Sequence, residues 1–183
     1  MKKHLVLTLA QSIMIFSSLL IVTVAVAQSS DKDKKMIADC DKAKAEFLQS
    51  DPLLKNVFAG AYGYVIFPNV GKGAVGVGGA SGNGIVYEKG KIVGKAHMSQ
   101  LTVGFQLGGQ AYRELIFFEN KEALDHFKEN KVEFSAQASA VVITEGASAN
   151  AKYKNGIMIF THQKGGAMAE ASMGGQKFEY NAF

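Results

Sequence analysis

Hydrophobic residues recur with a helical period at the start of the polar part of the chain. Between residues 36 and 49 they are three or four positions apart, and charged residues fill the remaining faces. This pattern predicts an amphipathic helix with one apolar stripe. The stripe consists of Met36, Cys40, Ala43 and Phe47. Asp51 followed by Pro52 then indicates the N-cap and first turn of a short second helix over residues 53–58.

After residue 60 the hydrophobic period changes from that of a helix to that of a β-strand. Residues 62–67 read YGYVIF, and Pro68 is expected to end this strand. Alternation over residues 132–143 and again over 147–154 predicts further strands, with small residues on one face. Turn signals separate the candidate strands. They are Gly82-Asn83-Gly84, Lys89-Gly90, Glu145-Gly146, Asn155-Gly156 and Lys164-Gly165-Gly166.

One short helix is expected to interrupt the strands. Asn120 has the residue type of an N-cap, and Ala123, Leu124 and Phe127 follow it at helical spacing. Small inward residues on the strands indicate a tightly curved sheet. The sequence therefore predicts an α+β fold: an N-terminal amphipathic helical arm, then a strongly bent, mostly antiparallel, glycine-rich sheet or barrel with one short inserted helix.

The first 27 residues have the pattern of a secretory signal peptide. A short basic head precedes a mostly apolar run that ends in Ala25-Val26-Ala27, the small-x-small pattern of a cleavage site. We therefore expect cleavage after Ala27, a flexible polar lead-in over residues 28–35 and a single domain over residues 36–183. The mature protein would then be periplasmic or secreted. The apolar run is also long enough to span a bilayer, so an uncleaved anchor is the alternative.

The densest glycine stretch is GKGAVGVGGASGNG, residues 71–84, which contains a G-x-G-x-x-G pattern. A dinucleotide site requires a helix directly after such a turn, because helix amides hold the pyrophosphate. The residues that follow are too rich in glycine for a helix, and the GK[ST] of a P-loop is missing. We interpret the glycines as structural, at bends or close backbone approaches. The predicted structural glycines are Gly71, Gly73, Gly76, Gly78, Gly79, Gly108, Gly109, Gly174 and Gly175.

Charge and residue types argue against several classes of function. The net charge of +4 falls to +2 without the two lysines of the leader, which is too little for a nucleic-acid footprint. The single cysteine, Cys40, is expected to pack as a small apolar residue. The histidines lie far apart in the sequence, and no G-x-S-x-G motif is complete. We therefore expect a protein that is not an enzyme and carries no cofactor or metal.

Four segments resemble the SYLF-domain family, and the resemblance extends over residues 35–180. They are GYVIFPNVGKGAVGVGGASGNGIVYEKGKIVG (63–94), SQLTVGFQLGGQAYRELIFFENKEALDHF (99–127), FSAQASAVVITEGASA (134–149) and KGGAMAEASMGGQKFEY (164–180). The resemblance implies a non-catalytic lipid-binding domain, with phosphoinositides as ligands of eukaryotic members. It also implies an N-terminal amphipathic helix that contributes to membrane contact. Some fungal relatives bind actin, which we do not expect of an exported chain.

Anionic phospholipid at a membrane surface is accordingly the expected partner. The candidate lipid-binding residues are Lys34, Lys35, Phe47 and Lys72. Lys72 falls on the motif lysine of the family, among backbone amides that could form an anion nest. Over residues 31–49, however, five lysines are balanced by five acids, which weakens attraction to anionic lipid. The apolar stripe therefore has two interpretations, docking on the sheet or contact with a membrane. The alternative function is binding of a protein partner in the envelope through this helix and exposed strand edges.

Overall fold

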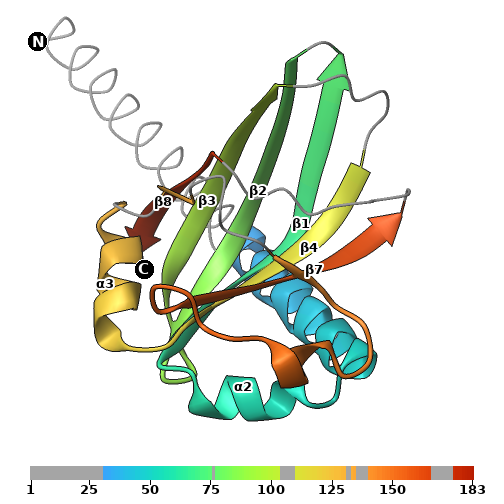
Figure 1. The fold of residues 1–183 in the computed structure, drawn as a ribbon. Coiled ribbons are helices and arrows are strands. Elements are labelled where there is room, and N and C mark those ends of the chain that lie inside the picture. The colour runs from blue at the N-terminus through green and yellow to red at the C-terminus, as the bar shows by residue number, and fades with distance from the viewer. Residues whose placement is uncertain (1–30, 76, 104–109, 131–132, 135–139, 166–174) are drawn as a thin grey trace, which may run out of the picture. The chain divides into compact units, whose positions relative to one another are not determined.

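The computed structural model describes residues 31–75, 77–103, 110–130, 133–134, 140–165 and 175–183. The chain divides into two compact units, Met1–Ala38 and Asp39–Phe183. Residues 31–50 are helical, so one helix crosses this boundary. The fold described below is that of the second unit, in which a sheet is accompanied by short helices (Figure 1).

Three short helical segments accompany the sheet. Helix α2 spans Leu54–Gly60, α3 spans Lys121–Lys128, and the 3-10 helix η1 spans Ala147–Asn150. At the start of α3 the side-chain oxygen of Asn120 accepts a hydrogen bond from the Ala123 N–H at 2.9 Å. The predicted N-cap is therefore confirmed. The three apolar residues expected on the inward side of this helix are buried, namely Ala123, Leu124 and Phe127.

Asp51 has a different role from the predicted N-cap. Its Oδ1 accepts a hydrogen bond from the Leu53 N–H at 3.0 Å and its Oδ2 accepts one from the Ser148 N–H at 2.7 Å, and the side chain is completely buried. The carboxylate therefore joins the turn before α2 to η1. The strand predicted over residues 147–154 is wrong, because η1 occupies the first half of this segment.

Eight strands form one mixed sheet in the order β5-β8-β3-β2-β1-β4-β7-β6 (Figure 1). The pairing of β6 with β7 is parallel, and the other described pairings are antiparallel. The strands are β1 (Gly63–Val75), β2 (Val77–Glu88), β3 (Lys91–Val103), β4 (Gln110–Phe118), β5 (Glu133–Phe134), β6 (Val141–Val142), β7 (Ile157–Gly165) and β8 (Gln176–Ala182). The α+β class is confirmed. The described strands form an open sheet, so the barrel alternative is wrong for this part of the chain.

Strand β2 decides the interpretation of the glycine stretch. Val77–Glu88 is a strand where a dinucleotide site would require a helix. The strand predicted over residues 132–143 is found only as the two short strands β5 and β6, and residues 135–139 between them lie outside the described part.

Strand β1 continues through Pro68 instead of ending there. The register of β1 shifts between Ile66 and Asn69 against β2, and between Phe67 and Val70 against β4. A bulge is one of the few positions in a sheet that accept proline, because the missing N–H is not needed for pairing there. The expectation that Pro68 stops the strand is therefore wrong, and the bulge is the physical reason.

Tight turns occur at three of the predicted positions. Lys89-Gly90, between β2 and β3, has φ angles of 48° and 76°, and Asn155-Gly156, before β7, has 51° and 76°. Positive φ at both central residues is what a type I′ turn requires. Glu145-Gly146 is also a turn. The turn predicted at Gly82-Asn83-Gly84 is wrong, because these residues lie inside β2. Of the turn predicted at Lys164-Gly165-Gly166, the first two residues end β7 and Gly166 lies outside the described residues.

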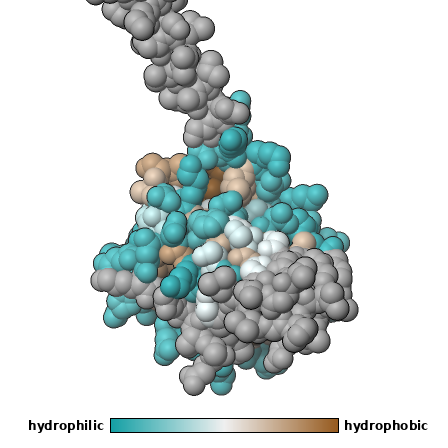
Figure 2. Space-filling view, turned by 90° about the horizontal axis from the view of Figure 1, so that it is seen from above, coloured by the Kyte–Doolittle hydropathy of each residue, from teal (hydrophilic) through white to brown (hydrophobic). Residues whose placement is uncertain are grey.

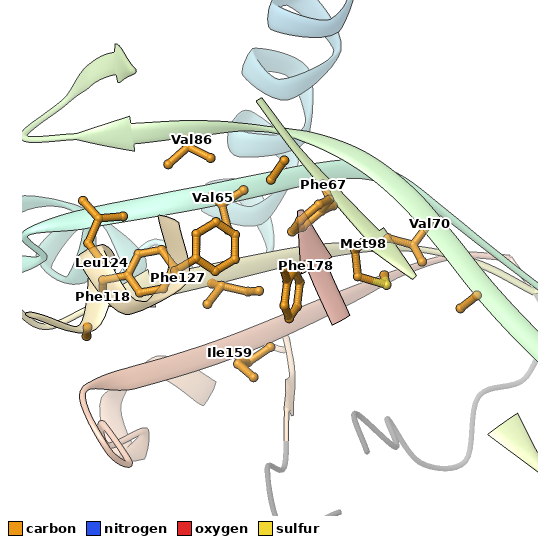
Figure 3. Close-up of a cluster of buried hydrophobic side chains, with 14 of the residues drawn as sticks. Val65, Phe67, Val70, Val86, Met98, Phe118, Leu124, Phe127, Ile159 and Phe178 are labelled. Atoms are coloured by element: carbon orange, nitrogen blue, oxygen red, sulfur yellow. The ribbon is translucent and has the colours of Figure 1, made fainter. Parts of the chain in front are cut away.

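Both faces of the sheet carry buried apolar side chains. The inner face packs against α3, and Figure 3 shows part of this cluster. Its members include Val65, Phe67, Val70, Met98, Ile116, Phe118, Phe127 and Phe178. The outer face packs against residues 39–50 and α2. Its buried strand residues include Tyr64, Ile66, Ile85, Tyr87, Leu115, Phe117 and Phe160.

The sheet is strongly bent around the inner face. Strands β1 and β8 are separated by β2 and β3, yet the ring centroids of Phe67 and Phe178 are 5.9 Å apart (Figure 3). Strands β4 and β8 are separated by three strands, yet the side chains of Glu114 and Gln176 are hydrogen-bonded. A flat sheet could not make these contacts, because adjacent strands are about 4.8 Å apart.

Among the glycines that the structure describes, the closest backbone approaches are at positions outside the predicted set. A Cβ on Gly84 would collide with the Ile66 carbonyl oxygen, and one on Gly94 would lie 2.5 Å from the Asn181 carbonyl oxygen. Gly71, which was in the predicted set, has open space around it. The predicted glycines Gly76, Gly108, Gly109 and Gly174 lie outside the described residues.

Candidate functional site

The four residues predicted to contact lipid lie in different places. Lys34 and Lys35 are exposed in the N-terminal unit, where Lys34 pairs with Asp31 at 3.6 Å. Phe47 is completely buried against the sheet. Lys72 lies on β1, where its backbone pairs with Ala80 on β2 and with Gln110 on β4.

The segment Asp39–Ser50 docks on the outer face of the sheet through its apolar side. Cys40, Ala43 and Phe47 are all at most 1% exposed. The Cys40 thiol donates a hydrogen bond to the Ile66 carbonyl oxygen at 3.4 Å, and burial raises its pKa to about 12. Cys40 is thus a packed, unreactive thiol, as expected from the sequence. For this segment, docking is the interpretation that the contacts support.

Lys44 is turned toward the sheet. Its ammonium group donates a hydrogen bond to the Tyr64 hydroxyl at 3.2 Å and lies 4.4 Å from the centroid of the Phe58 ring. The Phe58 ring meets Tyr64 and Phe117 edge to face, with centroids 5.0 and 4.8 Å apart. This lysine therefore stabilises the packing of helix, α2 and sheet through a cation–π contact.

A polar network of four side chains, the His162 network, lies at the end of this docked segment. It consists of Glu46 and Ser50 from the helix, Arg113 from β4 and His162 from β7. Arg113 forms an ion pair with Glu46, and its Nη1 lies 3.4 Å from His162 Nδ1. His162 Nε2 lies 3.1 Å from Ser50 Oγ, which donates to the Glu46 carbonyl oxygen at 3.0 Å.

The network assigns the tautomer of His162. A guanidinium only donates, so Nδ1 must accept and Nε2 must carry the proton, which it donates to Ser50 Oγ. Burial and the neighbouring Arg113 lower the pKa of His162, against the opposing effect of Glu46. The imidazole is therefore neutral when the network is complete.

Ser50 and His162 do not form a nucleophile–base pair. In a Ser-His-Asp triad a carboxylate accepts the Nδ1 proton of histidine and the histidine takes the serine proton. Here Nδ1 faces a guanidinium, and the serine proton is held by a backbone carbonyl. The arrangement links the helix to the sheet. Sequence reasoning missed it because its members are far apart in the sequence, Ser50 and His162 by 112 positions, although Arg113 stands out as the sole arginine of the chain.

A second polar group lies on the inner face, where Glu114 is completely buried. Its Oε2 accepts a hydrogen bond from Gln176 Nε2 at 3.0 Å, and its Oε1 has no hydrogen-bond partner. Burial raises the pKa of Glu114 to about 7, which the Gln176 hydrogen bond only partly offsets. Tyr112, two residues earlier, is also buried, and burial together with Glu114 raises its pKa. The carboxyl group is therefore poised between its neutral and charged forms near neutral pH.

Among the described residues, no three or more His, Cys, Asp or Glu side chains are grouped as a metal site would require. No helix in the described part is long and apolar enough to cross a bilayer. Within the described residues, the large hydrophobic side chains that are exposed lie on separate segments: Leu53, Ile92, Val142 and Phe183. Figure 2 shows mainly hydrophilic residues on the face seen from above, with hydrophobic residues in small groups.

Two comparisons with known proteins each give a match to this chain. Residues 99–182 match the Ysc84 family model, which is described as "Las17-binding protein actin regulator". Over 140 residues the chain is 27% identical to beta cell expansion factor A of Aeromonas veronii, an alignment that covers 75% of this chain and 53% of that protein. The chain thus spans about half the length of this relative.

Proposed function

We propose that this chain, whose residues 99–182 carry a Ysc84 (SYLF) family domain, is an exported, non-catalytic protein that engages anionic phospholipid at the cell envelope. The family match agrees with the resemblance predicted from the sequence motifs. A lipid-binding or envelope-associated role is consistent with that family. The export step is inferred from the N-terminal pattern of a basic head, an apolar run and Ala25-Val26-Ala27.

The observation that carries the proposal is the family match together with the absence of a catalytic arrangement among the described residues. In the contact between Ser50 and His162, the histidine donates to the serine and the serine donates to a backbone carbonyl, which is the wrong direction of proton donation for nucleophilic catalysis. The buried Glu114 has an amide and not a second carboxylate as its hydrogen-bond partner. Binding is therefore the better supported class of function.

Vesicle flotation tests the proposal directly. The purified protein is mixed at low salt with vesicles of phosphatidylglycerol or cardiolipin, and with phosphatidylcholine vesicles as the control. We expect the protein to float with the anionic vesicles only, and to be released as salt is added because the attraction to charged lipid is screened. Absence of flotation with both anionic lipids at low salt would contradict the proposal.

Binding of a protein partner is the second candidate. It is favoured by the edges of the sheet. There β5 and β6 are each two residues long, so in the described part they pair with only a short stretch of the outer side of β8 and β7. Such edges can pair with a strand of another chain. Cross-linking in the native envelope distinguishes the two candidates: a specific protein adduct without vesicle binding would favour this one.

A further inference from the structure

The docked segment Asp39–Ser50 and the outer face of the sheet bury apolar side chains against each other. On the helix these residues are Cys40, Ala43 and Phe47, and on the sheet they include Tyr64 and Ile66. A membrane role for either surface requires the segment to leave the sheet, because buried side chains cannot contact lipid. The contacts that hold its C-terminal end are therefore where such a step would be controlled.

We propose that the His162 network is a pH-sensitive clasp, which holds Asp39–Ser50 on the sheet while His162 is neutral and releases it when His162 is protonated. The expectation that release of the segment promotes lipid binding rests on the proposed function, whereas the control of docking by His162 does not. Histidine is the member whose ordinary titration range lies between pH 5 and 8. Glu46 and Arg113 form an ion pair beside it.

Protonation of His162 acts against its contact with Arg113. A proton on Nδ1 would point at the N–H groups of Arg113, so the hydrogen bond is lost and two positive charges become neighbours. Glu46 also faces the site, but its carboxylate is already engaged by Arg113. Ser50 and the Phe47 ring face His162 from the helix. Lys164, further along β7, donates to the Pro68 carbonyl oxygen at 3.5 Å.

Cys40 provides a built-in probe of the clasp. It is the only cysteine of the chain, and its thiol is completely buried between the docked segment, to which it belongs, and the sheet. Labelling with 4,4′-dithiodipyridine, which reacts with thiols in acid as well as at neutral pH, therefore requires the segment to open. The rate is divided at each pH by that of the protein unfolded in urea, so that the remaining pH dependence reports opening alone.

For the full chain we expect the normalised labelling rate to rise as the pH falls below about 6.5, by up to about tenfold per pH unit, because opening is coupled to uptake of one proton. The variant His162→Gln keeps one acceptor and one donor but cannot be protonated, so its rate should not change with pH. His126→Gln, on α3 and outside the network, is the matched control and should behave as the unaltered protein. A flat profile in the unaltered protein, or an unchanged slope in His162→Gln, would overturn the proposal.

A second variant keeps the test valid if His162→Gln does not fold. Ser50→Ala removes the acceptor of the Nε2 proton, so labelling of Cys40 should be several times faster at pH 7.5 while the rise in acid is retained. No acceleration at pH 7.5 would contradict the role given to Ser50 and with it the clasp.

Flotation with phosphatidylglycerol vesicles at pH 5.5 and 7.5 separates this inference from the proposed function. We expect more flotation at pH 5.5 for the unaltered protein and no such gain for His162→Gln. If labelling depends on His162 but no vesicle binds at either pH, the clasp is correct and the lipid function is wrong. If vesicles bind equally at both pH values and labelling is flat, the lipid function is correct and the clasp is wrong.

Discussion

Gln176 on β8 donates a hydrogen bond of 3.0 Å to Glu114 on β4, although three strands lie between them in the sheet. The bond crosses the inner face and is possible only because the sheet bends around it. It also explains how a carboxyl group is tolerated at a completely buried position: one oxygen has a partner, and burial favours the neutral form of the group.

Glu114→Gln should stabilise the protein in alkaline solution. The pKa of Glu114 is raised from 4.5 in the unfolded chain to about 7 in the folded one. Protonated Glu114 therefore makes its full contribution to stability below pH 4.5, and this contribution is lost as the pH rises through 7. The loss amounts to roughly 3 kcal/mol at most, and glutamine removes it. Urea unfolding at pH 5, 6.5 and 8 measures this, with the exposed Glu119→Gln as control. Equal pH slopes in Glu114→Gln and the unaltered protein would show the prediction to be wrong.

Asp51→Asn should destabilise the protein at neutral pH. The Asp51 carboxylate accepts two backbone hydrogen bonds while buried, and the amide nitrogen of asparagine cannot replace one of these acceptors. We expect a loss of about 1–3 kcal/mol in the free energy of unfolding. Asp125→Asn, which affects an exposed i,i+4 pair with Lys121 on α3, is the control and should cost less than about 0.5 kcal/mol.

The Asp51 effect should also depend on pH. Burial by itself would raise the pKa of Asp51, but the hydrogen bonds from Ser148 and Leu53 outweigh this and lower it below 3.8. A carboxyl group whose pKa is lowered by folding stabilises the folded state above pH 3.8, and this stabilisation is lost as the pH falls further. The difference in the free energy of unfolding between the unaltered protein and Asp51→Asn should therefore become smaller below pH 3.8. A difference that stays constant down to pH 2 would contradict this prediction.

Gly84→Ala and Gly71→Ala should differ strongly, although both glycines lie in the same glycine-rich stretch. A Cβ at Gly84 meets the Ile66 carbonyl oxygen and the Phe67 ring, whereas none of the surrounding atoms is within 4 Å of one at Gly71. We expect Gly84→Ala to lower the free energy of unfolding by about 1–3 kcal/mol or more, and Gly71→Ala to change it by less than about 0.5 kcal/mol. Thermal unfolding of both variants checks this, and similar losses would mean that the two positions are not distinguished by close approach.

The sequence predicts local elements well where the conformational preference of a single residue type determines the structure. Asn120 caps α3, and Asn155-Gly156 takes the positive φ angles of a tight turn, because these preferences are set within a few residues. The apolar stripe through Cys40 and Phe47 correctly predicts a helix with a buried side.

What the sequence does not predict depends on contacts between distant segments. Pro68 normally ends a strand, and only the bulge against both neighbours allows β1 to continue. Glu114 is a charged residue, a type that is rarely buried, yet it lies on the same face of β4 as Ile116, where the bend of the sheet buries it beneath β8. Likewise, the His162 network depends on a docked helix, and no short motif marks it.

Neutralising Lys34 and Lys35 should weaken binding to anionic vesicles if the proposed function is correct. Both side chains are exposed in the part of the helix before Asp39, and a lysine near an anionic surface contributes about 1 kcal/mol. The double variant Lys34→Gln and Lys35→Gln should therefore raise the dissociation constant for phosphatidylglycerol vesicles by roughly 30-fold at low salt, as measured by flotation at several lipid concentrations. Lys152→Gln and Lys154→Gln, also exposed, form the matched control with the same change in net charge. If the control pair weakens binding as much as the first pair, attraction to lipid follows net charge alone and the helix has no special role.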